Sequence, residues 1–216
     1  MFGVEAGKFL GFLLTEWGIE ANPDKCMTII GMRSPVSMKE VQQLTEHMVA
    51  LSRFLSASGD KRYPYFQCFK KNNRFVWTHE CEEAFTRLKE FLANPHVLCK
   101  SLSSTLTRLY FTVTDRKINS VIVQEQDRVQ KLVYFMSKVL QGLETRYQVN
   151  EKAALAVIFI ARQLRHYFQI FTVIVMIDLP ILKFLQKPHI AGHMVCWAID
   201  FSEFNVQYEP RGPIKS

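Results

Sequence analysis

Two stretches in the second half of the chain have the hydrophobic pattern of buried β-strands. In 109–115, LYFTVTD, the apolar Leu109, Phe111 and Val113 alternate with their neighbours at the two-residue period of a half-buried strand. In 172–178, TVIVMID, the apolar run is nearly continuous, which is typical of a strand covered on both faces. Three further stretches predict strands: 118–125, 130–137 and 204–209.

Helical patterns dominate the first half of the chain. Asn22 and Pro23 predict a helix start, with Asn22 as the N-cap and Pro23 at the first helical position. Ser37 and Glu40 have the spacing of a capping box before a second helix, and Thr78 begins a third. The last two helices each have one apolar stripe with spacings of three and four residues: Val41, Leu44, Met48, Leu51 and Leu55, then Cys81, Phe85, Leu88 and Leu92.

Three acidic residues lie at the ends of predicted elements. Asp115 and Asp178 close the two strands described first, and Glu151 opens a long helix over 151–168, with Asn150 as its N-cap. Taken singly, such a residue is more often a cap or a solvated group. Together, carboxylates at strand and helix ends can converge on one rim of a sheet and hold two divalent cations roughly 4 Å apart. The pattern therefore predicts a metal-dependent site that cleaves phosphodiesters.

The charge of the chain indicates a polyanionic partner. The 216 residues carry a formal net charge of +7, and 48% of them are hydrophobic, so we expect a folded, basic protein. A basic balance favours nucleic acid through counterion release. The candidate phosphate contacts are Lys61, Arg62, Lys70, Lys71 and Arg74, in a connection between helices, and Arg116 and Lys117. A solvated basic loop is the alternative for the first group.

Cysteine and hydropathy patterns narrow the class of protein. The five cysteines are scattered without CxxC spacing, which is typical of reduced intracellular thiols. His189, His193 and Cys196 lack a fourth zinc ligand at finger-like spacing, so a polar turn leading into a helix is the preferred interpretation. The start of the chain has no signal-peptide pattern, and no apolar stretch approaches the about 20 residues of a membrane span. We expect a cytoplasmic or nuclear protein with no membrane partner and no small-molecule substrate.

Eight motifs, taken in order, resemble the pol polyprotein of gypsy-type LTR retrotransposons over nearly all of the chain. They are FLGFLLTEWGI, NPDKC, VSMKEVQQLTEHMVALSRF, FVWTHECEEAFTRLKEFLANPHVL, LYFTVTD, TRYQVNEKAALAV, LRHYF and VMIDLP. The resemblance is to the last part of the reverse transcriptase palm, the thumb and the RNase H domain. A plant element, or a host gene captured from one, is the closest likeness.

This resemblance implies a domain order and a fold class. A palm remnant would occupy 1–35, a helical thumb-like region 36–99, a linker 100–108 and an RNase H-like domain 109–216. The class is α+β or α/β, with a five-stranded mixed sheet flanked by helices and truncated before the family's last helix. Within the palm remnant, 8–19 has the pattern of a hairpin with its turn at Trp17-Gly18. Without the rest of the palm, we expect this hairpin to lack partner strands and to pack poorly.

The resemblance also implies an activity, the two-metal hydrolysis of RNA in RNA–DNA hybrids with Mg²⁺ as cofactor. Asp115 would bridge both metals, and Glu151 and Asp178 would complete the site. The family's fourth acidic residue, on its last helix, has no counterpart here. No YxDD motif is present, so polymerase activity is not expected.

Further departures from the family pattern surround the first and third carboxylates. Arg116 and Lys117 follow Asp115 where the family has small residues and a glycine turn, and Leu179-Pro180 replaces a histidine after Asp178. Glu46 stands where a glycine is usual. We therefore expect cleavage to be weak or lost. The alternatives are a non-catalytic module that binds hybrid or duplex nucleic acid and an inert retroelement relic, which the sequence does not separate.

Overall fold

The computed structural model divides the chain into two compact units. One consists of Met1–Lys100 with Tyr134–Met136, and the other of Ser101–Val133 with Ser137–Ser216. The structure describes the following residues: 6–9, 12–15, 18–56, 58–68, 75–94, 97–102, 105–126, 129–179 and 192–212. The candidate phosphate contacts Lys70, Lys71 and Arg74 lie outside these ranges, as does His189.

The first unit contains an antiparallel sheet of four short strands. Its order is β1 (Ala6–Phe9), β2 (Phe12–Thr15), β3 (Gly18–Ala21) and β4 (Leu98–Cys99). The described parts of the predicted hairpin at 8–19 thus belong to a larger sheet, and Trp17 of its predicted turn lies outside the described residues. The expectation that it lacks a partner strand is wrong, because β3 pairs with β4 and the ends of β3, Gly18 and Ala21, are buried.

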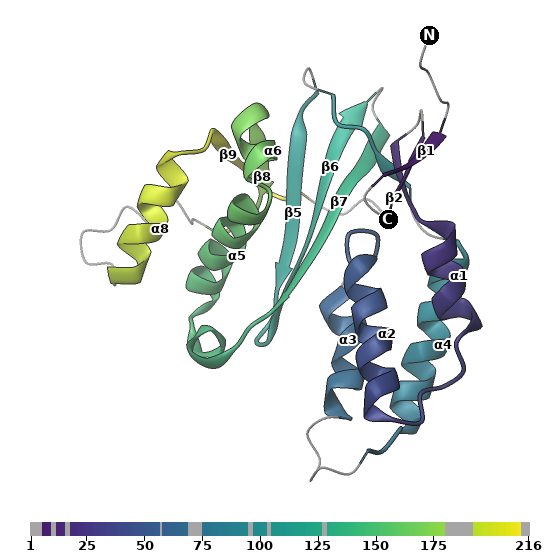
Figure 1. The fold of residues 1–216 in the computed structure, drawn as a ribbon. Helices are drawn as coiled ribbons and strands as arrows, with labels where there is room; N and C mark the ends of the chain where they lie inside the picture. Colours follow the sequence, from purple (N-terminus) through teal and green to yellow (C-terminus); the bar gives the residue numbers. More distant parts are fainter. Residues whose placement is uncertain are drawn as a thin grey trace. The chain divides into compact units, whose positions relative to one another are not determined.

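The described residues of this unit also form four helices (Figure 1): α1 (Pro23–Gly31), α2 (Met38–Ala50), α3 (Ser58–Gln67) and α4 (His79–Ala93). The predicted N-caps are confirmed: Asn22 Oδ1 accepts from the Asp24 amide at 2.9 Å, and the hydroxyls of Ser37 and Thr78 accept from the amides of Glu40 and Cys81 at 3.3 Å. The return bond of the predicted capping box differs, because the Glu40 carboxylate accepts from the Val36 amide at 2.8 Å. Every residue of the two predicted apolar stripes is buried, including Leu51 and Leu55 beyond the end of α2.

Two of the candidate phosphate contacts lie on a helix, α3, that the sequence did not predict. The sequence pattern predicted that Lys61 and Arg62 lie in a connection, whereas the structure places both on α3. Gly59 and Pro64 lie within this helix. Because glycine and proline are the strongest local signals for loops, they concealed the helix.

The second unit is built on a five-stranded sheet, as predicted. The strands are β5 (Thr107–Val113), β6 (Lys117–Gln126), β7 (Val129–Val139), β8 (Val173–Met176) and β9 (Val206–Glu209), in the order β7-β6-β5-β8-β9. The sheet is mixed, because β5 pairs antiparallel with β6 and parallel with β8, which pairs parallel with β9. All four residues of β8 are buried, which confirms a strand covered on both faces.

Strand β5 begins at Thr107, inside the stretch predicted as a linker. Thr107 is fully buried, and its hydroxyl accepts from Nε2 of the equally buried Gln124 at 2.9 Å. Because the strand begins with a polar residue, the pattern of apolar positions did not reveal where it starts.

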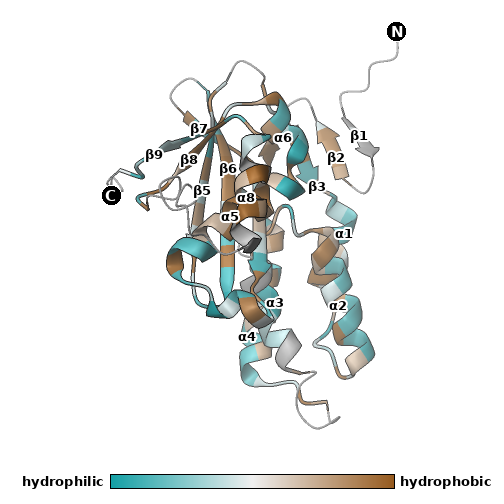
Figure 2. Ribbon diagram, turned by 90° about the vertical axis from the view of Figure 1, so that its left-hand side faces the viewer, coloured by the Kyte–Doolittle hydropathy of each residue, from teal (hydrophilic) through white to brown (hydrophobic). Residues whose placement is uncertain are grey.

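The 3₁₀ helix η1 (Gly142–Arg146), α5 (Val149–Gln163) and α6 (Arg165–Ile170) come between β7 and β8, and α8 (Gly192–Ser202) comes between β8 and β9. The long predicted helix is interrupted at Leu164, and its N-cap is Gln148 in place of Asn150. Helix α5 packs against β5 and α8 through a nearly all-buried apolar surface. Figure 2 shows the hydrophobic character of the strands beside it. Among the described residues, no helix has the length and apolarity required to cross a membrane.

Candidate functional site

Asp115 lies in the tight turn that joins β5 to β6. The Thr114 amide donates to the Lys117 carbonyl oxygen at 2.9 Å, and the Thr114 hydroxyl donates to the same oxygen at 3.3 Å. The Asp115 side chain is fully exposed. It therefore lies just past the end of β5, at the place that the strand pattern predicted.

Asp178 lies just past the end of β8, the parallel neighbour of β5. Its Oδ1 accepts from the Arg211 amide at 2.9 Å. Tyr110 pairs with Met176, so Asp178 comes two residues after the paired position and Asp115 comes five residues after it. Asp115 thus lies farther along the common strand direction than Asp178, because its strand and turn extend beyond the end of β8.

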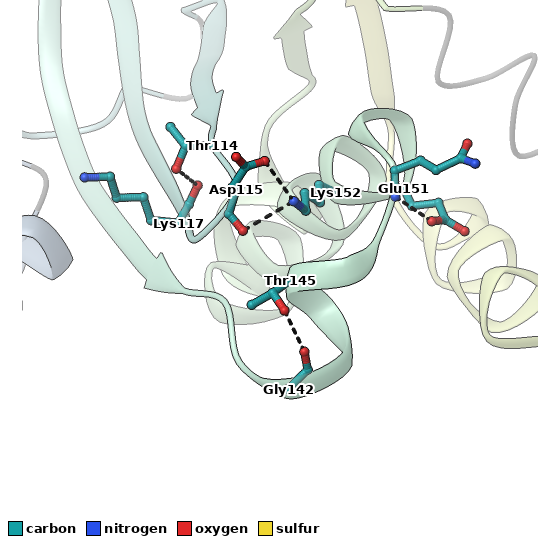
Figure 3. A network of polar contacts seen from close by, with 8 residues as sticks. Thr114, Asp115, Lys117, Gly142, Thr145, Glu151 and Lys152 are labelled. Carbon is teal, nitrogen blue, oxygen red and sulfur yellow. Dashed lines mark hydrogen bonds and ion pairs between the residues drawn. The ribbon is translucent and has the colours of Figure 1, made fainter. Parts of the chain in front are cut away.

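Glu151 is the third residue of α5 and binds the start of its own helix. Its Oε2 accepts from the Gln148 amide at 2.8 Å. This is the capping-box bond, in which an acidic side chain satisfies a free backbone N–H at a helix N-terminus. In Figure 3 the Glu151 side chain points away from Asp115. The three-residue spacing of Gln148 and Glu151 is the sequence signal for this role.

Lys152, which sequence reasoning missed, is the residue of α5 that contacts Asp115. Its Nζ lies 3.3 Å from the Asp115 carbonyl oxygen and 3.5 Å from Oδ1, and its side chain is only 6% exposed. Figure 3 shows it bridging from the first turn of α5 to the β5–β6 turn. The sequence signal for a partly buried role was the position of this lysine directly before the apolar run AALAV, where the helix faces the core.

The three candidate carboxylates do not form a metal-binding group in this structure. Asp115 faces an ammonium, Glu151 accepts from the Gln148 amide, and Asp178 accepts from the Arg211 amide. In the part of the chain that the structure describes, no three His, Cys, Asp or Glu side chains are grouped so that they could hold a metal ion. The residues present therefore do not fit the two-metal site that the resemblance implies.

The described candidate phosphate contacts differ in how far their side chains are buried. Lys61 Nζ lies 3.6 Å from the centre of the Phe91 ring, and burial lowers the pKa of its ammonium. Arg62 Nε donates to the Ser58 carbonyl oxygen at 3.2 Å, and burial likewise lowers the pKa of its guanidinium. Arg116 is exposed in the turn beside Asp115. Among the described candidates, Arg116 is the exposed one, and Lys61, Arg62 and Lys117 are half-buried.

Comparison with known sequences connects the chain to retroelements. The model of the RNase H-like domain found in reverse transcriptase matches residues 77–175. The Transposon Tf2-3 and Tf2-4 polyproteins of Schizosaccharomyces pombe are 24% identical over 164 residues, which is 75% of this chain and 12% of each polyprotein. The chain thus spans about an eighth of these relatives. They come from a fission yeast, and the likeness to a plant element stays a prediction.

Comparison with solved structures supports the fold. The foamy viral protease-reverse transcriptase in complex with dsDNA superimposes with a TM-score of 0.78 and 15% identity, over 99% of this chain and 46% of that one. The same enzyme in complex with RNA/DNA hybrid gives a TM-score of 0.75 and 16% identity, over 97% and 30%. The mixed α+β architecture with its five-stranded sheet is an RNase H-like fold.

Proposed function

We propose that this chain, a retrotransposon pol fragment of the gypsy type, binds RNA–DNA hybrid or duplex nucleic acid with weak or no cleavage. The observation that carries the proposal is the bonding of the three candidate carboxylates to three different groups of the protein. These bonds support the proposal that the chain retains the RNase H-like fold without the carboxylate arrangement that cleavage requires.

Two features support nucleic-acid binding. The chain has a formal charge of +7, and counterion release from a polyanion rewards such a charge. Its fold is shared with foamy viral enzymes that were solved with dsDNA and with RNA/DNA hybrid. The contacts that we propose are Arg116 and Lys117 in the RNase H-like unit and Lys61 and Arg62 on α3, together with Lys70 and Lys71.

The proposed loss of cleavage concerns Mg²⁺, which would be the cofactor of the ancestral hydrolysis. In a two-metal site, the ions activate a water molecule and stabilise the leaving oxygen. Asp115, Glu151 and Asp178 would be the ligands by resemblance, and their present bonds do not suit that role. If any activity persists, its class is that of a ribonuclease acting on RNA–DNA hybrids.

A combined binding and cleavage assay tests this proposal. A fluorescently labelled RNA–DNA hybrid is titrated with the chain at several KCl concentrations, and the same hybrid is incubated with the chain in MgCl₂ and resolved on a gel. We expect the logarithm of the affinity to fall linearly with the logarithm of the salt concentration. We expect cleavage to be undetectable or very slow.

Two outcomes contradict the proposal. Absence of binding at low ionic strength excludes the binding function and leaves the inert relic. Rapid cleavage that is abolished by Asp115→Asn shows that the proposed loss of cleavage is wrong and that the carboxylate site is functional.

A further inference from the structure

The Lys152 ammonium is placed where a free lysine is unfavourable. It lies in the first turn of α5, where the helix dipole favours negative charge. Its side chain is 6% exposed, although lysine side chains usually extend to bring their charge into water. Burial of an ammonium is costly unless the charge is paired. A compensating interaction is therefore required at this position.

Asp115 supplies that interaction with two oxygen atoms. Lys152 Nζ lies 3.3 Å from the backbone oxygen and 3.5 Å from carboxylate Oδ1 of the same residue. These are hard, negatively polarised oxygens, the type of ligand that Mg²⁺ and Mn²⁺ also prefer. The ammonium thus lies beside the carboxylate that would be the first ligand of a divalent cation.

We propose that the Lys152 ammonium is the counterion of the Asp115 carboxylate. It neutralises this carboxylate and excludes a divalent cation from it. The inference deepens the proposed loss of cleavage and rests on it, because it assigns that loss to one residue of this chain. It does not involve nucleic-acid binding. The contact joins residues 37 positions apart and so depends on the packing of α5 against β5.

Charge reversal at position 152 tests the proposal directly. Lys152→Glu replaces the ammonium with a carboxylate at the same helical position, so that two carboxylates flank one space. Mn²⁺ binding to the full chain is measured by electron paramagnetic resonance without nucleic acid. We expect Asp115-dependent binding to be absent in the original chain and to be about tenfold tighter or more in Lys152→Glu, since a repulsive unit charge becomes an attractive one.

Two further variants serve as matched controls. Lys152→Gln removes the cation without adding a ligand, so it should gain less Mn²⁺ affinity than Lys152→Glu. Asp115→Asn combined with Lys152→Glu should lose the gain. Mn²⁺ binding by the original chain that Asp115→Asn abolishes would overturn the proposal, as would a Lys152→Glu variant that folds and gains no affinity.

Thermal unfolding gives a second readout that needs no metal. Asp115→Asn should lower the unfolding midpoint of the original chain, because it leaves a buried ammonium without its anion. The same change should have a much smaller effect in a Lys152→Met background, where no charge remains to be paired. Equal effects in both backgrounds would contradict the pairing. Failure of hybrid binding would affect neither measurement, so the two proposals fail independently.

Discussion

Neighbouring residues in the first turn of α5 have opposite charges and different roles. The Glu151 carboxylate accepts from the Gln148 amide and closes the helix start, whereas the Lys152 ammonium reaches Asp115. Successive helical residues point about 100° apart, so adjacent side chains cannot share one partner. At the scale of single residues, the helical geometry therefore assigns the carboxylate to capping and the lysine to the candidate site.

The capping role of Glu151 leads to a stability prediction. Glu151→Ala should lower the free energy of unfolding by roughly 0.5–1 kcal/mol, because it leaves the Gln148 amide without its acceptor and removes a negative charge from the helix N-terminus. Urea denaturation measures the change.

Glu203→Ala is the matched control in the same unit. Glu203 pairs with Arg165 at 3.0 Å, but both side chains are about half exposed, and such surface pairs contribute little. If Glu203→Ala destabilises the chain as much as Glu151→Ala does, the capping interpretation is wrong.

At the scale of elements, the join between β3 and β4 depends on one glycine. Gly18 has a φ of +151°, a conformation that residues with a side chain rarely adopt. A Cβ at this position would lie 2.1 Å from the Leu98 carbonyl oxygen. Only glycine permits the two backbones to approach this closely. The strand pair thus brings the start and the end of the helical segment into one sheet.

Gly18→Ala should separate β3 from β4. The collision is with backbone, so the strands must move, and we expect a loss of at least roughly 2 kcal/mol of stability. Hydrogen exchange of the amides in β3 and β4 should become faster. Gly31→Ala is the control, because a Cβ there meets nothing within 4 Å. Alanine also suits the helix better by up to about 1 kcal/mol, so stability should be unchanged or higher. Equal stability of the two variants would refute this role of Gly18.

At the scale of the whole molecule, the net charge of +7 is distributed over side chains that are exposed to different extents. The Lys61 ammonium lies over the Phe91 ring and loses part of its hydration, whereas the Arg116 side chain is exposed beside Asp115. Long-range attraction depends on all of these charges, but close contact with a phosphate requires a side chain that is exposed at the surface. The accessible cations should therefore determine the salt dependence of binding.

This difference gives the third variant pair. Arg116→Gln should weaken hybrid binding and reduce the slope of log affinity against log salt by about 0.9, the effect of one phosphate contact. Lys61→Gln should change the slope less and should instead lower the thermal stability, because it removes a cation–π contact worth about 0.5–1 kcal/mol. The reverse order of the two slopes would contradict the assignment.

The sequence by itself determined the features that arise between near neighbours. The caps at Asn22, Ser37 and Thr78 follow from side chains that accept from backbone amides two or three residues away. The apolar stripes and the strands follow from periodicity, and the order of the elements was sufficient to expect a five-stranded mixed sheet.

Only the tertiary structure decided what the candidate site contains. The sequence placed Asp115, Glu151 and Asp178 at element ends, which is where the structure has them, but no local pattern gives the direction of a side chain or its partner. Lys152 meets Asp115 across 37 residues because α5 packs on β5, and Asp115 lies beyond Asp178 because of the strand register. Such long-range contacts depend on how whole elements pack, and burial of the apolar surface of α5 determines that packing.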